Sequence, residues 1–290
     1  ANDVILNNRS RYDKQLRTDN DEGDPIYVYK ASDEKSEAQF VVGRILELQQ
    51  EEGLSLDKFA ILYRTNAQSR VIEEYLVKSN IDYTIVGGTK FYDRKEIKDL
   101  MAYLRLICNP DDDLSFKRIV NEPKRGIGAA SIEKLTQFAN EAELSLMASI
   151  DEVDNGIARA TLNKFIDFKQ MIYMLRSQIE AYSIAEFIDL VLRQTGYLEM
   201  LENENTIEAD SRIDNLGEFQ SMATQFEEVD LNEILAEEES EERADELSTM
   251  TKLVILLNDL MLQTDTETEE EANESKVTLM TIHAAKGLEF

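Results

Sequence analysis

The stretch that decides the fold is FAILYRTNAQSRVIEEYL, residues 59–76. It opens with an apolar run, FAILY, which predicts a strand buried within a parallel sheet. A polar turn, RTNAQS, follows. The apolar residues after the turn recur at helical spacing, namely at Val71, Ile72, Tyr75 and Leu76. A buried strand that leads through a turn into a helix is the repeating unit of a parallel α/β sheet.

Three further runs of strand-forming residues flank this unit. IYVYK at 26–30, YTIV at 83–86 and VTLMTI at 277–282 are rich in β-branched and aromatic residues, so each predicts a strand. Apolar residues also repeat at helical spacing between the first two strands, at Ala38, Val41, Ile45 and Leu48. The alternation of strands and helices therefore predicts an α/β sheet.

A long block between these strands has only helical periodicity. We expect no strand from about residue 110 to residue 265. Ser183 and Glu186 form a capping box that predicts the start of one helix. The acidic, Thr-rich stretch 264–275 predicts a linker, and EEESEERADE at 237–246 predicts a solvated helix or a loop. The fold class that we expect is α/β with a large all-helical insertion.

The composition of the 290 residues excludes several kinds of site. One cysteine, Cys108, excludes an internal disulfide framework and a cysteine-based zinc site, and one histidine excludes a histidine-cluster metal site. Cys108 lies in an apolar helical run, which predicts a buried structural thiol. No stretch approaches the roughly 18 apolar residues that span a bilayer, and residues 1–20 have no apolar core of a signal peptide. We expect a cytoplasmic protein with no metal site and no membrane partner.

The net charge of −28 argues at first against a nucleic-acid ligand, because phosphates repel an acidic chain. The charge is unevenly distributed, however. Residues 200–275 hold 24 of the 59 acidic residues and 3 of the 31 basic ones, which gives −21 of the −28. Basic DNA-facing patches elsewhere in the chain remain compatible with this composition.

Two candidate ligand-binding segments follow predicted strands. Arg64 comes directly after FAILY, and the carboxyl end of a parallel strand is where α/β sheets bind ligands. Its planar guanidinium suits a phosphate, and the alternative is a solvated surface arginine. In VTLMTIHAAKGLEF, residues 277–290, Thr281 and His283 would donate to a nucleic-acid phosphate and Glu289 would accept a ribose hydroxyl. The alternative for His283 is a satisfied core histidine.

Two further basic segments suit nucleic acid. PKRGIGAAS, residues 123–131, places a Gly-Ile-Gly turn before a helix, where free backbone N–H groups favour a phosphate. Its candidate duplex-binding residues are Lys124, Arg125, Gly126, Ile127, Gly128 and Ser131. An ordinary helix–helix turn is the alternative. A cluster of Lys90, Arg94, Lys95 and Lys98 beside Phe91 and Tyr92 would neutralise and stack single strands, or would be a solvated helix start with Phe91 buried.

These segments together resemble one family. Residues 59–76, 85–106, 109–128, 206–219 and 277–290 look like the PcrA/UvrD/Rep group of superfamily 1A DNA helicases, most closely its PcrA-type members. The resemblance covers essentially the whole chain and is weakest at 140–180 and 220–275.

The resemblance implies a domain layout. Residues 1–25 would be the tail of motor domain 1A, and residues 26–108 the first part of the RecA-like domain 2A. Residues 109–274 would be the helical 2B insertion, and 2A would resume, truncated, at 275–290. The incomplete 2A sheet is thus interrupted by the 2B subdomain.

The resemblance also implies roles for the candidate residues. Arg64 would be catalytic and contact the γ-phosphate of ATP, and Lys286, Gly287 and Glu289 would approach the γ-phosphate and ribose. Thr281 and His283 would touch single-stranded DNA. The turn from Gly126 to Gly128 would hold duplex DNA.

The function that this resemblance implies is an ATP-dependent 3′-to-5′ DNA helicase and translocase of repair or plasmid replication. No GxxxxGK(S/T) phosphate loop and no Walker B pair stand in the sequence. The parent would use ATP and Mg²⁺, with the Mg²⁺ ligands outside this chain, and this chain alone would hydrolyse no ATP. Its partners would be single-stranded and duplex DNA and repair or replication proteins. Two alternatives remain, a regulatory DNA- or protein-binding module without catalysis and a helical scaffold without a ligand.

Overall fold

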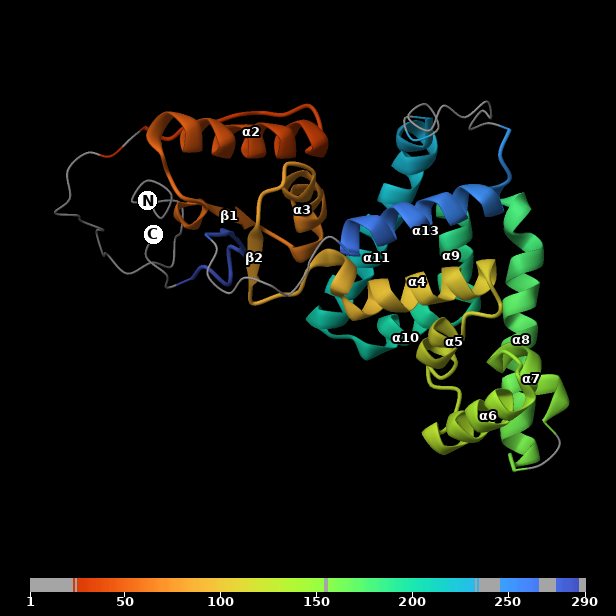
Figure 1. The fold of residues 1–290 in the computed structure, drawn as a ribbon. Helices are drawn as coiled ribbons and strands as arrows, with labels where there is room; N and C mark the ends of the chain where they lie inside the picture. The colour runs from red at the N-terminus through yellow and green to blue at the C-terminus, as the bar shows by residue number, and fades with distance from the viewer. Residues whose placement is uncertain are drawn as a thin grey trace.

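The computed structural model describes residues 23, 25–153, 156–232, 234, 246–265 and 275–286. Figure 1 shows a small α/β body beside a larger helical body. The α/β body is built from the following elements: α2 (Glu34–Glu52), β1 (Ala60–Tyr63), α3 (Ser69–Lys78), β2 (Tyr83–Val86) and β3 (Val277–Thr281).

The helical body follows β2 in the chain. Its helices are α4 (Lys95–Cys108), α5 (Asp113–Ile119), α6 (Ala129–Ala142), α7 (Leu146–Glu152), α8 (Arg159–Gln178), α9 (Ile184–Gln194), α10 (Tyr197–Glu204), α11 (Ile207–Gln225) and α13 (Thr249–Asp265). Within the described residues, 110–265 contain no strand, as the periodicity predicts. Short helical turns are η1 (Leu56–Lys58), η2 (Asn66–Gln68), η3 (Phe91–Asp93), η4 (Ile179–Ala181) and η5 (Phe226–Asp230).

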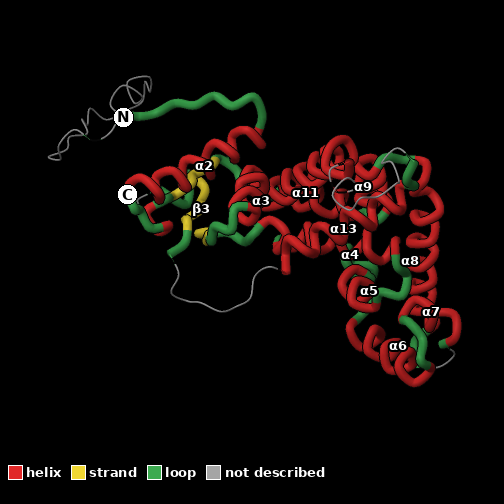
Figure 2. The backbone as a smooth tube through the Cα atoms, turned by 45° about the horizontal axis from the view of Figure 1, so that its top comes forward, coloured by secondary structure: helices red, strands yellow, loops and turns green. Residues whose placement is uncertain are grey.

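The sheet has three parallel strands in the order β1-β3-β2. The last of the described strands therefore lies between the other two, and Tyr63 of β1 pairs in register with Thr281 of β3. Helices α2 and α3 pack on each other and against these strands (Figure 2). The strands predicted at 59–63, 83–86 and 277–282 are confirmed with boundaries that differ by one residue at most.

The strand predicted at 26–30 is wrong. Residues 26–30 pair with no strand in the described part of the chain, and Ile26, Tyr27 and Val28 are exposed. Tyr29 instead stacks on Phe40 of α2, with 3.9 Å between ring centroids. A strand needs a hydrogen-bonded neighbour, and β-forming composition alone does not supply one.

The two bodies have separate apolar cores. The core of the α/β body includes Val42, Ile45, Leu76 and Leu279, whereas the larger core contains α4 from Ile97 onward together with the other helices. Phe91, in the turn before α4, already belongs to the larger core. The boundary between domain 2A and the 2B insertion, expected between residues 108 and 109, stays a prediction.

A network of charged and polar side chains joins the two bodies. Arg94, which is 7% exposed, donates through Nη1 to Asn215 Oδ1 of α11 at 2.8 Å and through Nη2 to Ser69 Oγ of α3 at 2.8 Å. Arg70 of α3 donates through Nε to Glu218 of α11 at 2.7 Å. The hydrogen bonds and ion pairs between α3 and α11 therefore help to fix the orientation of the α/β body relative to the helical body.

The single cysteine is partly rather than fully buried. Cys108 ends α4 and packs against the helical core, and burial raises the pKa of its thiol to about 11. Its backbone carbonyl accepts a hydrogen bond from Arg176 of α8 at 2.6 Å. The prediction of a buried thiol is thus met only in part, and its structural role stays a prediction. No helix among the described residues is long and apolar enough to cross a membrane.

Candidate functional site

Two of the predicted ligand-binding segments meet at one edge of the sheet. Arg64 follows β1 and His283 follows β3, and these strands are parallel neighbours. The Arg64 Nη1 atom lies 3.0 Å from His283 Nδ1, although the two residues are 219 positions apart in the chain. Both side chains are exposed, so His283 is not the core histidine of the alternative interpretation.

A short turn after β1 fixes the backbone of Arg64. The side-chain oxygen of Gln68 accepts hydrogen bonds from the backbone N–H of Arg64 at 2.9 Å and of Thr65 at 3.1 Å. Thr65 and Gln68 also form the capping box of η2. The polar turn RTNAQS thus folds on itself and leaves the Arg64 guanidinium at the carboxyl-end edge of the sheet, where a phosphate would meet it.

A second turn shapes the segment after β3. Thr281 Oγ1 accepts from the backbone N–H of Ala284 at 3.1 Å, and the Thr281 carbonyl accepts from Ala285 at 3.0 Å. The Lys286 N–H donates to the His283 carbonyl at 3.3 Å, and the Lys286 side chain is exposed. The other two predicted nucleotide-binding residues, Gly287 and Glu289, lie outside the described residues.

The Gly-Ile-Gly turn lies in the helical body, immediately before α6. Gly126 has a φ of +70°, which favours glycine, and Ile127 is 1% exposed and anchors the turn in the core. Asn121 Oδ1 holds the turn by accepting from the backbone N–H of Arg125 at 2.9 Å and of Ile127 at 3.0 Å. Gly128 is the N-cap of α6 and supplies no side chain to its first N–H groups.

The neighbouring residues of this turn differ in exposure. The side chain of Lys124 is exposed, and Ser131 in the first turn of α6 is half-buried. The Ser131 N–H donates to the Gly128 carbonyl at 2.9 Å. The exposed cation and the uncapped helix start therefore lie in one short segment, as the sequence predicts.

The role predicted for Arg125 needs correction. Its guanidinium is turned into the protein, where Nη2 donates to Tyr103 Oη at 2.7 Å and to the Thr195 carbonyl at 3.1 Å, and Nη1 donates to the Ile119 carbonyl at 3.0 Å. The same group lies 5.2 Å from the ring centroid of Phe168. Arg125 is therefore a positioning residue that holds the turn against three segments of the helical body, and its charge does not face solvent.

One cation near the turn was missed by sequence reasoning. Lys164 of α8 donates through Nζ to the Gly126 carbonyl at 3.0 Å. A Cβ at Gly126 would lie 2.5 Å from that same Nζ atom. Gly126 lies 38 residues before Lys164, and the two share no local sequence motif. Their contact follows from the packing of α8 against the turn, which the sequence does not show.

The predicted basic cluster around Phe91 does not form an exposed stacking surface. Phe91 is fully buried, as in the alternative interpretation, and Arg94 belongs to the network between the two bodies. Burial lowers the pKa of Arg94. Lys98 remains partly exposed and pairs with Asp93 at 2.5 Å.

Among the described residues, no group of three or more His, Cys, Asp or Glu side chains is placed to hold a metal ion. The exposed guanidinium of Arg64 fits one phosphate of a nucleotide at the sheet edge. The arrangement thus presents two surfaces, an Arg64–His283 edge on the α/β body and a Gly126–Gly128 turn on the helical body.

Comparison with known proteins places these features in one family. The sequence profile described as UvrD-like helicase C-terminal domain matches residues 1–290. A protein named ATP-dependent DNA helicase PcrA from Bacillus subtilis (strain 168) is 48% identical over 296 residues, which cover 100% of this chain and 38% of that protein.

Two further relatives carry the same name. The protein from Staphylococcus aureus (strain Mu50 / ATCC 700699) is 45% identical over 291 residues, which cover 100% of this chain and 37% of the relative. The protein from Leuconostoc citreum is 42% identical over 292 residues, again with 100% and 37% covered. The chain thus spans a little over a third of the length of the curated relatives it matches.

Proposed function

This chain belongs to the UvrD-like helicase C-terminal domain family, and on that premise we propose that it is part of an ATP-dependent DNA helicase. The observation that carries the proposal is the meeting of Arg64 and His283 at one edge of the sheet, 3.0 Å apart. A phosphate-binding arginine and a DNA-binding histidine on adjacent parallel strands would couple a nucleotide to a DNA strand. The finer proposal is 3′-to-5′ translocation in repair or plasmid replication.

On the nucleotide side, Arg64 would hold a γ-phosphate oxygen across a cleft between two motor domains. The planar fork and permanent charge of a guanidinium suit this task. Lys286, Gly287 and Glu289 would approach the γ-phosphate and ribose. The ATP and Mg²⁺ of the parent would supply phosphoryl-transfer chemistry, and we expect the Mg²⁺ ligands outside this chain.

On the DNA side, Thr281 and His283 would contact the single strand, and the turn from Gly126 to Gly128 would hold the duplex. Backbone N–H groups at the uncapped start of α6 favour a phosphate there. Lys124 adds an exposed charge, and Ser131 would add a hydroxyl donor. Arg125 would act through the geometry of the turn.

The test is fluorescence anisotropy of the chain with a 3′-tailed duplex at low and moderate salt. We expect salt-sensitive binding, because lysine–phosphate contacts release counterions. Lys124→Glu should weaken it, whereas the matched control Lys58→Glu, at the opposite edge of the sheet from Arg64, should not. Arg125 is unsuited to this test because its loss would unfold the turn.

Three outcomes would contradict parts of the proposal. Negligible DNA affinity at every salt concentration would favour the alternative of a regulatory protein-binding module. Equal weakening by Lys124→Glu and Lys58→Glu would remove the turn from the duplex site. Robust ATP turnover by the pure chain would contradict the expectation that this chain alone is inactive.

A further inference from the structure

A groove of about 540 Å³ lies on the helical body between α4, α5 and α13, beside η3. Its basic lining residues are Lys98, Arg105 and Arg118, and its apolar lining includes Met101, Leu114 and Met261. None of these residues belongs to the sheet edge or to the Gly126–Gly128 turn. The groove is thus a distinct surface that the proposed function leaves unused.

The groove is basic on the surface of an acidic protein. Its lining carries three cationic side chains and one carboxylate, that of Asp93, whereas the whole chain has a net charge of −28. Asp93 pairs with Lys98 at 2.5 Å. Arg118 pairs at 2.8 Å with Asp99, whose side chain is only 3% exposed and lies behind the groove. With Lys98 and Arg118 already paired, Arg105 is the lining cation without an ion pair among the described residues, and its charge favours an anionic ligand.

Arg105 is the residue of the groove that we expect to contact an anionic ligand. Its Nε is buried and has no hydrogen-bond partner among the described residues. A buried guanidinium N–H without an acceptor is uncommon in folded proteins, and Arg105 also lines the groove, so the rest of its guanidinium is the group that an anion in the groove would contact. The planar fork of arginine matches the oxygens of a phosphate.

Apolar side chains beside the cations narrow the ligand further. Leu114 is 82% exposed and Met261 is 42% exposed, and both line the groove. Inorganic phosphate would leave these side chains in water. A nucleotide unit offers both an anionic backbone and a flat base that covers apolar surface.

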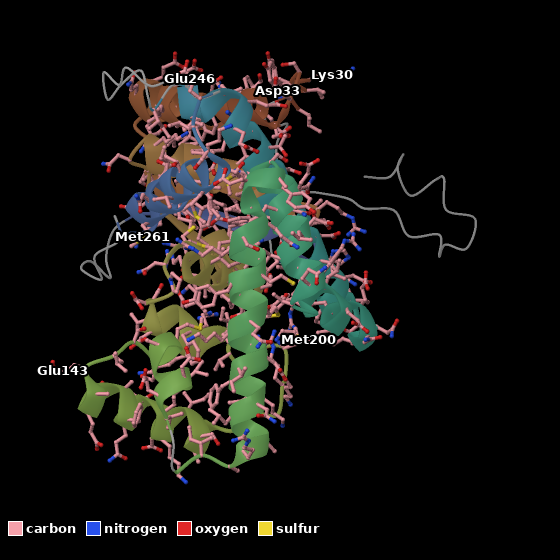
Figure 3. The ribbon with its side chains drawn as sticks, turned by 90° about the vertical axis from the view of Figure 1, so that its right-hand side faces the viewer. Lys30, Asp33, Glu143, Met200, Glu246 and Met261 are labelled. Carbon is pink, nitrogen blue, oxygen red and sulfur yellow. The ribbon has the colours of Figure 1, made fainter. Side chains whose placement is uncertain are left out.

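We propose that this groove binds a single-stranded segment of nucleic acid, with a phosphodiester on Arg105 and Arg118 and a base against Leu114 and Met261. The proposal rests on the proposed function, because it adds a second DNA surface to the helical body. Figure 3 shows Met261 on the same flank as Glu143, the C-cap of α6, and Met200 on the opposite flank.

The first test uses fluorescein-labelled dT12 and the full chain at two salt concentrations. Arg105→Gln should weaken binding about tenfold, the size of one lost charged hydrogen bond. The slope of log affinity against log salt should fall by about 0.7 for one phosphate contact to a single strand. Arg105→Gln leaves no partner unsatisfied, because the described residues hold no acceptor for Nε.

The matched control is Arg193→Gln. Arg193 lies on α9, away from the groove, and pairs only with Asp189 of its own helix among the described residues. Arg193→Gln removes one positive charge from the helical body, as Arg105→Gln does. Equal effects of these two variants on dT12 binding would overturn the proposal. Displacement of dT12 by pyrophosphate, with no dependence on Leu114→Ala, would also overturn it and indicate a small anion instead.

A second measurement reports the location directly. Leu114→Cys can be labelled with a fluorophore, because burial keeps the pKa of the native Cys108 thiol at about 11. Binding of dT12 should change the emission of this label and not that of a label at Tyr173→Cys, an exposed position on α8. An unchanged Leu114→Cys signal at saturating dT12 would overturn the groove assignment.

The two proposals fail in different ways. If the chain binds neither dT12 nor a tailed duplex, the proposed function and the groove both fail. If the tailed duplex binds through Lys124 while Arg105→Gln behaves like Arg193→Gln, the groove alone is wrong.

Discussion

Arg94→Ala should loosen the junction between the two bodies. Arg94 donates to Asn215 and Ser69 at 2.8 Å each, and all three side chains are at least nine-tenths buried. The substitution removes both hydrogen bonds and leaves the Asn215 oxygen without its donor. It also leaves the buried Glu73, whose Oε1 lies 3.8 Å from Arg94, without that cation.

The magnitude follows from these contacts. Two hydrogen bonds from a charged donor contribute about 3–5 kcal/mol together, which agrees with the loss of one partner from a buried ion pair. With a urea m-value of about 3 kcal/mol per molar for a chain of this size, the unfolding midpoint should fall by about 1–1.7 M.

The assay is urea unfolding followed by far-ultraviolet circular dichroism. Arg193→Ala is the control, since it removes an exposed arginine from an i,i+4 pair and should leave the midpoint unchanged. Arg94→Lys should give an intermediate loss, because lysine keeps the charge without the fork. A midpoint of Arg94→Ala equal to that of Arg193→Ala would refute the reasoning.

Three further predictions concern the turn and the cysteine. Arg125→Met should lower the free energy of unfolding by about 3 kcal/mol in the same urea assay, since buried carbonyls lose their donor, whereas Lys124→Glu should leave the midpoint unchanged and weaken only DNA binding. Gly126→Ala should cost about 1 kcal/mol because of its positive φ, and Lys164→Ala in the same background should recover none of that strain. The Cys108 thiol, with its pKa raised by burial from 9.0 to about 11, should react with a disulfide reagent more slowly in the native chain than in urea at pH 9. Because the pKa of this thiol is higher in the folded state than in the unfolded state, its contribution to stability is present below pH 9 and is lost as the pH rises through about 11. If the reaction rate of the native chain with the disulfide reagent levels off near pH 9, the raised pKa is contradicted.

The strands show what local sequence can and cannot predict. FAILY and YTIV are short apolar runs bounded by turns, and both form strands within one residue of the prediction. IYVYK is also rich in β-branched and aromatic residues, yet it forms no strand in the described part of the chain. The difference is a hydrogen-bonding neighbour, which β1 and β2 find in β3 and residues 26–30 do not.

The candidate site divides in a similar way. The approach of Arg64 to His283 follows from parallel strands, whose carboxyl ends share one edge of a sheet. Lys124 and Arg125 are adjacent cations with opposite orientations, which their sequence context does not show. The acceptors of Arg125 include residues 103 and 195, which are distant in the sequence, and the nearby carbonyls of residues 119, 120 and 123, so its orientation depends on tertiary packing as well as on the local turn.

The central place of β3 has a consequence for synthesis of the chain. Among the described strands, β1 and β2 each pair only with β3, which starts 191 residues after β2 ends at Val86. At roughly 5–20 residues per second, a ribosome needs about 10–40 s to make that interval. Both earlier strands therefore wait on the nascent chain with unpaired edges while the helices between them and β3 emerge. The helical body has its own core and can form during that delay, so the described helices can fold before the sheet closes.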